Sequence, residues 1–180
     1  MRIRGDAVAS VSSLVPRVYV MEHEPAYILV ALGTDEHPVD RAVDLVGRLR
    51  PDHRLVIQHG HTPRREWPDV TWHDFVPFER IRELMSGAEV VVCHAGVGTI
   101  MTALPFGHPP VVIPRLASRG EHVDDHQLQI VTTLSDRGLV VPVVEDDIGA
   151  AIAAARQRAV ERSRDSGLAK AVVAAVESER

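Results

Sequence analysis

The sequence has one cysteine, no long apolar run and no net positive charge. Its one cysteine, Cys93, excludes an internal disulfide and is typical of a protein from a reducing compartment. No apolar run approaches the roughly 20 residues that a membrane-spanning helix needs. The segment after Arg2 and Arg4 is too short and polar for a secretory signal, so we expect a cytoplasmic chain whose membrane contacts are peripheral. The net charge of −5 at pH 7 argues against nonspecific nucleic-acid binding.

The remaining sequence has the pattern of one α/β domain, and its 180 residues are too few for two full domains. From Ala26 onward, short apolar runs alternate with segments of helical periodicity, which predicts a Rossmann-like parallel sheet with helices on both faces. Residues 1–25 form an N-terminal extension, in which 18–22 is either an edge strand or part of a loose segment. The predicted strands are 26–32, 54–60, 69–76, 89–93, 109–114 and 139–143. The predicted helices are 38–49, 78–88, 99–107, 123–138, 146–164 and 166–178.

The clearest motif is "HAGVGT" (94–99), which follows the most apolar of the predicted strands. Ligands of parallel sheets bind beyond the carboxyl ends of the strands, so the loop is well placed for binding. Gly96 and Gly98 permit a positive φ and leave no Cβ in the way of a ligand. The first backbone N–H groups of the following helix favour an anion, and Thr99 can cap that helix or donate its hydroxyl to a phosphate. The motif therefore predicts a phosphate cradle, with a plain tight turn as the alternative.

Two other strand exits carry polar motifs. Gly33 and Thr34 follow the first strand, where they form either a second ligand loop or a capped turn. A dense polar cluster occupies 115–127, whose amide and imidazole groups suit sugar hydroxyls, although a solvated loop is the alternative. His122 and His126 are four residues apart, which leaves zinc as a further alternative even though no H-E-x-x-H motif supports it.

These motifs, in this order, resemble the C-terminal, nucleotide-sugar-binding domain of GT-B glycosyltransferases of family 28. The resemblance spans about residues 26–145. Within the family, the pattern of this chain is most similar to that of the small split enzymes of bacterial exopolysaccharide synthesis (PssE/EpsF type). It implies that residues 26–180 form a single GT-B C-terminal-type domain that binds a UDP-sugar. The segments that carry it are 29–46, 90–104, 109–115 and 120–127.

The resemblance also implies roles for individual residues. Gly33 and Thr34 would face the donor phosphates or the acceptor, and the backbone around Phe75 and Val76 would hold uracil. Thr102 stands where larger relatives often carry an acidic residue for the ribose hydroxyls. The diphosphate would lie against His94, Ala95, Gly96, Gly98 and Thr99. The donor sugar and pyrophosphate would lie against Arg115, His122, Asp125, His126 and Gln127.

The activity implied is inverting transfer of a hexose or N-acetylhexosamine from a UDP-sugar to a lipid-linked saccharide, in exopolysaccharide or cell-envelope glycan synthesis. A full GT-B enzyme has two domains, so the resemblance implies a membrane-anchored partner subunit that binds the acceptor and holds this chain at the cytoplasmic membrane. His94 and His126 are the candidate catalytic residues, although the general base can equally lie on the partner. We expect no essential metal and no cofactor, because helix N-termini and Arg115 would stabilise the departing UDP.

Two other functions fit the same sequence. One is a non-catalytic subunit that binds a nucleotide-sugar or only its partner, and the other is a nucleotide-sugar 2-epimerase-like enzyme. The arginine-bearing helices expected at the C-terminus either dock the partner or an anionic membrane surface, or present a solvated face.

Overall fold

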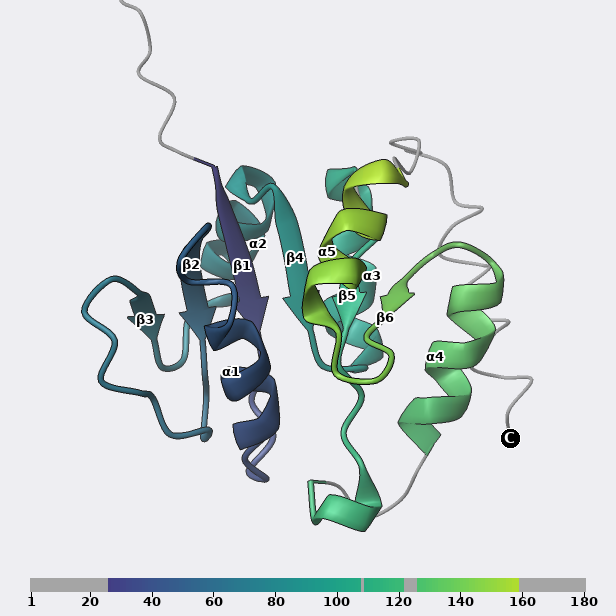
Figure 1. The fold of residues 1–180 in the computed structure, drawn as a ribbon, viewed down its shortest axis with the longest axis horizontal. Helices are drawn as coiled ribbons and strands as arrows, with labels where there is room; N and C mark the ends of the chain where they lie inside the picture. The colour runs from purple at the N-terminus through teal and green to yellow at the C-terminus, as the bar shows by residue number, and fades with distance from the viewer. Residues whose placement is uncertain (1–25, 108, 122–125, 159–180) are drawn as a thin grey trace, which may run out of the picture.

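The computed structural model describes residues 26–107, 109–121 and 126–158, and these form a parallel sheet between two layers of helices (Figure 1). The six strands lie in the order β3-β2-β1-β4-β5-β6, and all neighbouring pairs are parallel. The chain therefore builds outward from β1 in one direction and then from β4 in the other, which confirms the predicted Rossmann-like fold. The strands are β1 (Tyr27–Ala31), β2 (Arg54–Gln58), β3 (Thr71–His73), β4 (Val90–Cys93), β5 (Val111–Val112) and β6 (Val141–Pro142).

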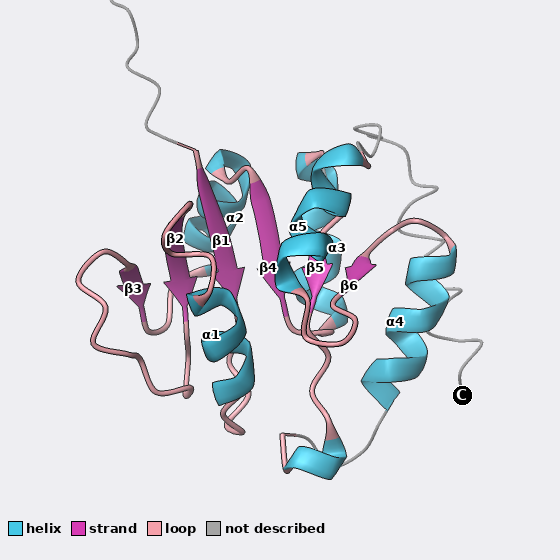
Figure 2. Cartoon of the chain, viewed as in Figure 1, coloured by secondary structure: helices cyan, strands magenta, loops and turns pink. Residues whose placement is uncertain are grey.

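Helices cover both faces of the sheet (Figure 2). Helices α1 (Asp40–Gly47) and α5 (Ile148–Gln157) pack on one face, and α2 (Phe78–Gly87), α3 (Val97–Ala103) and α4 (His126–Asp136) pack on the other. Alternate side chains of β1 supply the two cores: Ile28 and Val30 point toward α1 and α5, while Leu29 and Ala31 point to the opposite face. A strand buried on both faces must be apolar throughout, which is why the central strands read as continuous apolar runs.

The three central strands end in register. Ala31, the last residue of β1, lies opposite Gln58 of β2 and Cys93 of β4, which are also the last residues of their strands. The loops that follow these strands therefore leave the sheet side by side. The order of the strands reverses between β1 and β4, so a crevice is expected at this point.

Several predicted elements differ in extent from those observed. The helix predicted over 99–107 begins two residues earlier, and Pro105 and Gly107 close it through a 3₁₀ turn, η1 (Leu104–Phe106). A second 3₁₀ turn, η2 (Ala117–Arg119), lies in the polar segment after β5. The N-terminal extension, most of the predicted terminal helices and residues 122–125 lie outside the described residues. Among the helices that the structure describes, none has the length and apolar character to cross a membrane.

Candidate functional site

A cavity of about 580 Å³ opens at the carboxyl ends of β1, β2 and β4, where the strand order reverses. Its walls come from the loops after β1, β3 and β4, from the ends of β1 and β2, and from one side each of α2 and α3. The structure thus brings together the two glycine loops that the sequence singled out. The predicted site residues that line the cavity are Gly33, Thr34, Val76, His94, Gly96, Gly98, Thr99 and Thr102. The other lining residues are Ala31, Asp35, Gln58, Phe78, Ile81 and Met85.

The His94 ring packs between two glycines. A Cβ on Gly33 would lie 2.6 Å from Cε1 of His94, and a Cβ on Gly96 would lie 2.2 Å from Nε2 of the same ring. Gly33 also has a φ of +76°, which any other residue adopts only with strain. The imidazole therefore requires glycine at both positions, because any side chain there would overlap the ring.

The prediction that Gly96 and Gly98 provide positive φ is wrong. Gly96 has a φ of −68° and caps α3, while Gly98 is the second residue of that helix and is not among the positive-φ glycines. Gly96 is a glycine because of the His94 ring. At Gly98 a Cβ would meet no described atom within 4 Å, so this position opens onto empty space beside the cavity.

The two threonines of α3 differ in their hydrogen bonding. Thr99 is the third helical residue and not the cap, and no side-chain hydrogen bond caps the described part of this helix. Thr99 is instead one of the residues that line the cavity. Thr102 donates its hydroxyl proton to the Gly98 carbonyl at 2.7 Å, so toward the cavity this oxygen presents lone pairs. A ligand hydroxyl can therefore donate to Thr102.

Gln58 is a lining residue that the sequence analysis passed over. Its side chain is 4% exposed and makes three hydrogen bonds: Oε1 accepts from the Gly33 N–H at 3.0 Å, and Nε2 donates to the carbonyls of Gly33 and Asp74 at 2.9 Å each. The available signal was a polar residue closing the otherwise apolar run "LVIQ".

Asp35 places a carboxylate at the edge of the cavity. It accepts hydrogen bonds from the backbone N–H and the ring Nδ1 of His37, both at 2.8 Å, and lies 3.5 Å from the Arg115 guanidinium. Burial alone would raise the pKa of Asp35, but the hydrogen bonds from His37 and the charge of Arg115 outweigh it and lower that pKa. The group is therefore an anion at neutral pH.

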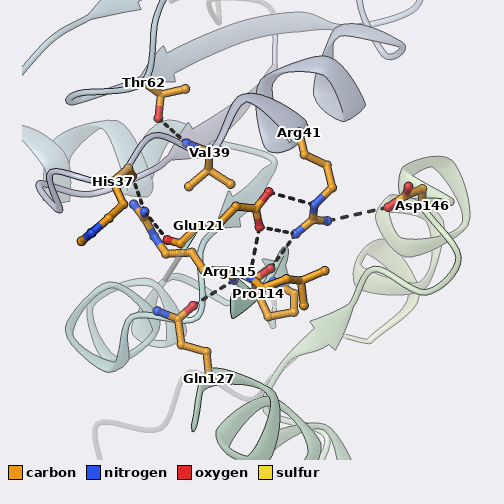
Figure 3. A network of polar contacts seen from close by, with 10 residues as sticks. His37, Val39, Arg41, Thr62, Pro114, Arg115, Glu121, Gln127 and Asp146 are labelled. Carbon is orange, nitrogen blue, oxygen red and sulfur yellow. Dashed lines mark hydrogen bonds and ion pairs between the residues drawn. The ribbon is translucent and has the colours of Figure 1, made fainter. Parts of the chain in front are cut away.

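Arg115 occupies a different place from the one predicted for a donor-binding residue. Its side chain is 1% exposed and does not line the cavity. The guanidinium donates to the backbone carbonyls of His37 and Glu121 (Figure 3). It also donates to the Leu32 carbonyl, and so ties the end of β5 to the loop after β1. The buried polar atoms of these loops require such partners, and a long arginine side chain can reach them.

A second arginine completes this network. Arg41 of α1 donates to both carboxylate oxygens of Glu121, at 3.2 and 3.0 Å, and to the Pro114 carbonyl at 2.7 Å (Figure 3). Glu121 in turn accepts from the Leu116 N–H at 3.0 Å. The polar segment after β5 is therefore partly structural, since its acidic and basic groups hold loops together.

The other predicted site residues do not line the cavity or are not among the residues that the structure describes. The Gln127 Oε1 accepts from the Arg115 N–H at 3.0 Å, so it holds the start of α4 against the end of β5. Phe75 is exposed, with its ring edge-to-face on His61 at 5.0 Å between centroids, and Ala95 is buried. His126 begins α4, but its side chain is not described, and His122 and Asp125 lie outside the described residues.

Among the residues that the structure describes, none outside these loops suggests a different chemistry. Cys93 is fully buried, and burial raises the pKa of its thiol to about 12, which agrees with an inert core residue. Within the part of the chain that the structure describes, no three His, Cys, Asp or Glu side chains gather as metal ligands would. His122, on which the zinc alternative depends, is not part of that description.

The strand order and the position of the cavity define a Rossmann-like domain with a cavity at its switch point. Residues 27–175 match the model of the glycosyltransferase family 28 C-terminal domain, and the chain belongs to that family. No curated protein matches the sequence.

The solved structure of one glycosyltransferase shares this fold. The glycosyltransferase SnogD from Streptomyces nogalater is 18% identical, with a TM-score of 0.52, and the match covers 99% of this chain and 44% of SnogD. The kitacinnamycin glycotransferase is 23% identical, with a TM-score of 0.47, over 88% of this chain and 40% of that one. This chain therefore spans well under half the length of these similar structures.

Proposed function

We propose that this chain is the donor-binding subunit of a glycosyltransferase and that its cavity holds a UDP-sugar. The observation that carries the proposal is the meeting of the two glycine loops around His94 at the switch point of the sheet. The family to which the chain belongs supports it. The sugar passes, with inversion, to a lipid-linked saccharide that a membrane-anchored partner subunit binds.

The diphosphate would lie against the start of α3. The first N–H groups of a helix have no partner within it, and here they border the empty space beside Gly98. Because α3 has only seven residues, these N–H groups and the hydroxyls of Thr34 and Thr99 supply the attraction, and a long helix dipole does not. Asp35 does not oppose a phosphate strongly, since the Arg115 guanidinium lies 3.5 Å from it and offsets its charge.

The nucleoside would lie against the apolar side of the cavity. Val76, Phe78 and Ile81 form a wall that suits the faces of a uracil ring. Thr102 offers a lone pair to a ribose hydroxyl because its own proton is donated to Gly98. It would thus serve as a neutral counterpart of the acidic residue that larger relatives carry.

In the proposed reaction the acceptor hydroxyl oxygen bonds to the anomeric carbon, and the bond from that carbon to the β-phosphate oxygen breaks. UDP leaves with the electron pair, and the acceptor proton passes to a general base. His94 is the candidate base on this chain, and the partner subunit is the other source. N–H and hydroxyl donors would stabilise the charge on UDP, so we propose that no divalent metal is required.

A non-catalytic, donor-binding subunit is the second candidate. The matches to the first two similar structures cover only 40% and 44% of those proteins, so the activity of the whole proteins does not transfer to this chain. Turnover of a UDP-sugar by this chain together with its partner separates the two candidates.

The first test is calorimetric titration of the full chain with UDP, UDP-glucose and UDP-N-acetylglucosamine, with GDP as the control nucleotide. We expect UDP and at least one UDP-sugar to bind with micromolar to millimolar affinity, equally with and without EDTA. GDP should bind more weakly, because a purine is larger than the uracil that the proposal places against the wall at Val76. Absence of UDP binding, alone and with the partner present, would overturn the proposal, and a loss of binding in EDTA would overturn its metal-free part.

A further inference from the structure

Gln58 joins two walls of the cavity that come from different strands. We propose that Gln58 is a positioning residue that fixes the distance between the Gly33–Thr34 loop and the 74–76 loop, and thereby sets the affinity for the donor. The inference rests on the proposed function, in which the first loop faces phosphates and the second faces the base. It goes beyond that function because it assigns the alignment of both loops to one side chain.

The hydrogen bonds of Gln58 continue the sheet beyond its last residue. The backbone of β1 pairs with β2 as far as Leu32, whose N–H donates to the Gln58 carbonyl at 3.0 Å. One residue later, the side chain takes over: it satisfies both the N–H and the C=O of Gly33. The same Nε2 donates to the Asp74 carbonyl, just after β3. One carboxamide thus bridges the exits of β1 and β3, with β2 between them.

The backbone around the Gly33 and Asp74 carbonyls, which Gln58 joins, is closely packed. Gly60 has a φ of +54°, and a Cβ there would lie 2.4 Å from the Gly33 carbonyl oxygen. The Gly60 N–H donates to the Asp74 carbonyl at 3.2 Å, so the two carbonyls that Gln58 binds are also contacted by Gly60. On its other side, Gly33 meets the His94 ring. The Gly33 peptide is therefore held between Gln58, Gly60 and His94.

A carboxamide is the group that this junction requires. It carries an acceptor and two N–H donors on one plane, and here it uses the acceptor once and the donor nitrogen twice. Glutamate has nearly the same shape but, when ionised, faces two carbonyl oxygens without a donor. Leucine leaves all three backbone groups of the junction without this partner.

A residue that only supports the fold would affect stability and leave the affinity of a correctly folded site unchanged. Gln58 differs from such a residue because it also lines the cavity, and because the loops that it joins carry Thr34 and Val76. Displacement of binding groups by about 1 Å can cost about a hundredfold in function. We therefore expect a substitution of Gln58 to weaken donor binding far more than a substitution elsewhere that destabilises the fold by the same amount.

The test compares Gln58→Leu and Gln58→Glu with Thr62→Val. Thr62 is a matched control, since it is buried and its hydroxyl accepts one hydrogen bond, from the Val39 N–H at 3.0 Å, but it does not line the cavity. Three measurements are made on the full chain: thermal unfolding, calorimetric UDP affinity well below the unfolding temperature, and hydrogen exchange of the Gly33 amide by NMR.

We expect both Gln58 variants to weaken UDP binding by at least about tenfold, which equals 1.4 kcal/mol. Thr62→Val should lower the unfolding temperature and change UDP affinity less than about twofold. The Gly33 amide should exchange faster in Gln58→Leu than in the wild type, whereas Gln58→Glu, which keeps the acceptor, should retain part of the protection.

The outcomes separate this inference from the proposed function. Wild-type UDP affinity in both folded Gln58 variants would overturn the inference and leave the proposed function intact. Unchanged Gly33 exchange in Gln58→Leu would also overturn it, whatever ligand the cavity binds. A wild-type chain that binds no UDP, alone or with its partner, would overturn the proposed function and the donor part of the inference with it.

Discussion

Gly98 offers a substitution that should separate stability from binding. It is the second residue of α3, it lines the cavity, and a Cβ there meets no described atom within 4 Å. Replacing it with aspartate removes part of the entropic cost of a helical glycine, which is about 0.5–1 kcal/mol relative to alanine. An acidic residue in the first turn of a helix adds about 0.3–1 kcal/mol. We therefore expect Gly98→Asp to be more stable than the wild type by about 1 kcal/mol, which raises the unfolding temperature by roughly 2–4 °C.

The same substitution should abolish donor binding. A carboxylate about 5 Å from one phosphate charge, at an effective dielectric constant of about 20, costs about 3 kcal/mol. That energy corresponds to a loss of more than about a hundredfold in UDP affinity. Gly98→Asn is the matched control, because it adds nearly the same volume without the charge and should bind UDP better than the aspartate variant.

Thermal unfolding without ligand and calorimetric titration with UDP measure the two effects. A more stable Gly98→Asp variant with wild-type UDP affinity would refute the assignment of the phosphate to the start of α3. A large fall in unfolding temperature would refute the claim that the space beside Gly98 is open. Equal losses of affinity in the aspartate and asparagine variants would show that volume, and not charge, excludes the ligand.

Three further predictions concern single residues. Gly33→Ala should destabilise the fold by about 1–3 kcal/mol, measured by denaturant unfolding, because its φ is +76° and its Cβ would lie 2.6 Å from the His94 ring; a change below about 0.5 kcal/mol would contradict this. Cys93 should not react with iodoacetamide at pH 8 in the folded protein, since its pKa is about 12, and should be labelled only after unfolding, as mass spectrometry would show. Because the folded pKa of Asp35 lies below its ordinary value of 3.8, its ionised form contributes stability that is present above that value and is lost as the pH falls through the folded pKa. Asp35→Asn should therefore be less stable than the wild type at pH 7, and the difference should shrink as the pH falls below 3.8; a difference that does not shrink in acid would rule out this titration.

The sequence predicted the layers of the fold well because apolar periodicity depends on local spacing. The continuous run at 90–93 had to be a buried strand, and the glycines after it had to lie at a strand exit. The sequence also predicted that the loops at Gly33 and Gly98 would face one site, since parallel strands end at the same edge of a sheet.

What could not be predicted were the directions of long polar side chains. Arg115 has the residue type and position of an anion-binding group, yet its guanidinium turns back to buried carbonyls of the loop after β1. Gln58 was passed over because its partners are 16 and 25 residues away, so no local pattern marks them. The reason for Gly96 was equally hidden, because it depends on how the His94 ring is oriented.

The packing of His94 between Gly33 and Gly96 also constrains how this family can vary. The imidazole fills the volume that a methyl group at either glycine would need, so a gain of side chain at 96 requires a smaller residue at 94. A smaller residue at 94 would not permit a side chain at 33, because the positive φ of residue 33 favours glycine whichever residue is at 94. Among relatives that keep this loop geometry, residues 94 and 96 should therefore change together, while residue 33 stays constant.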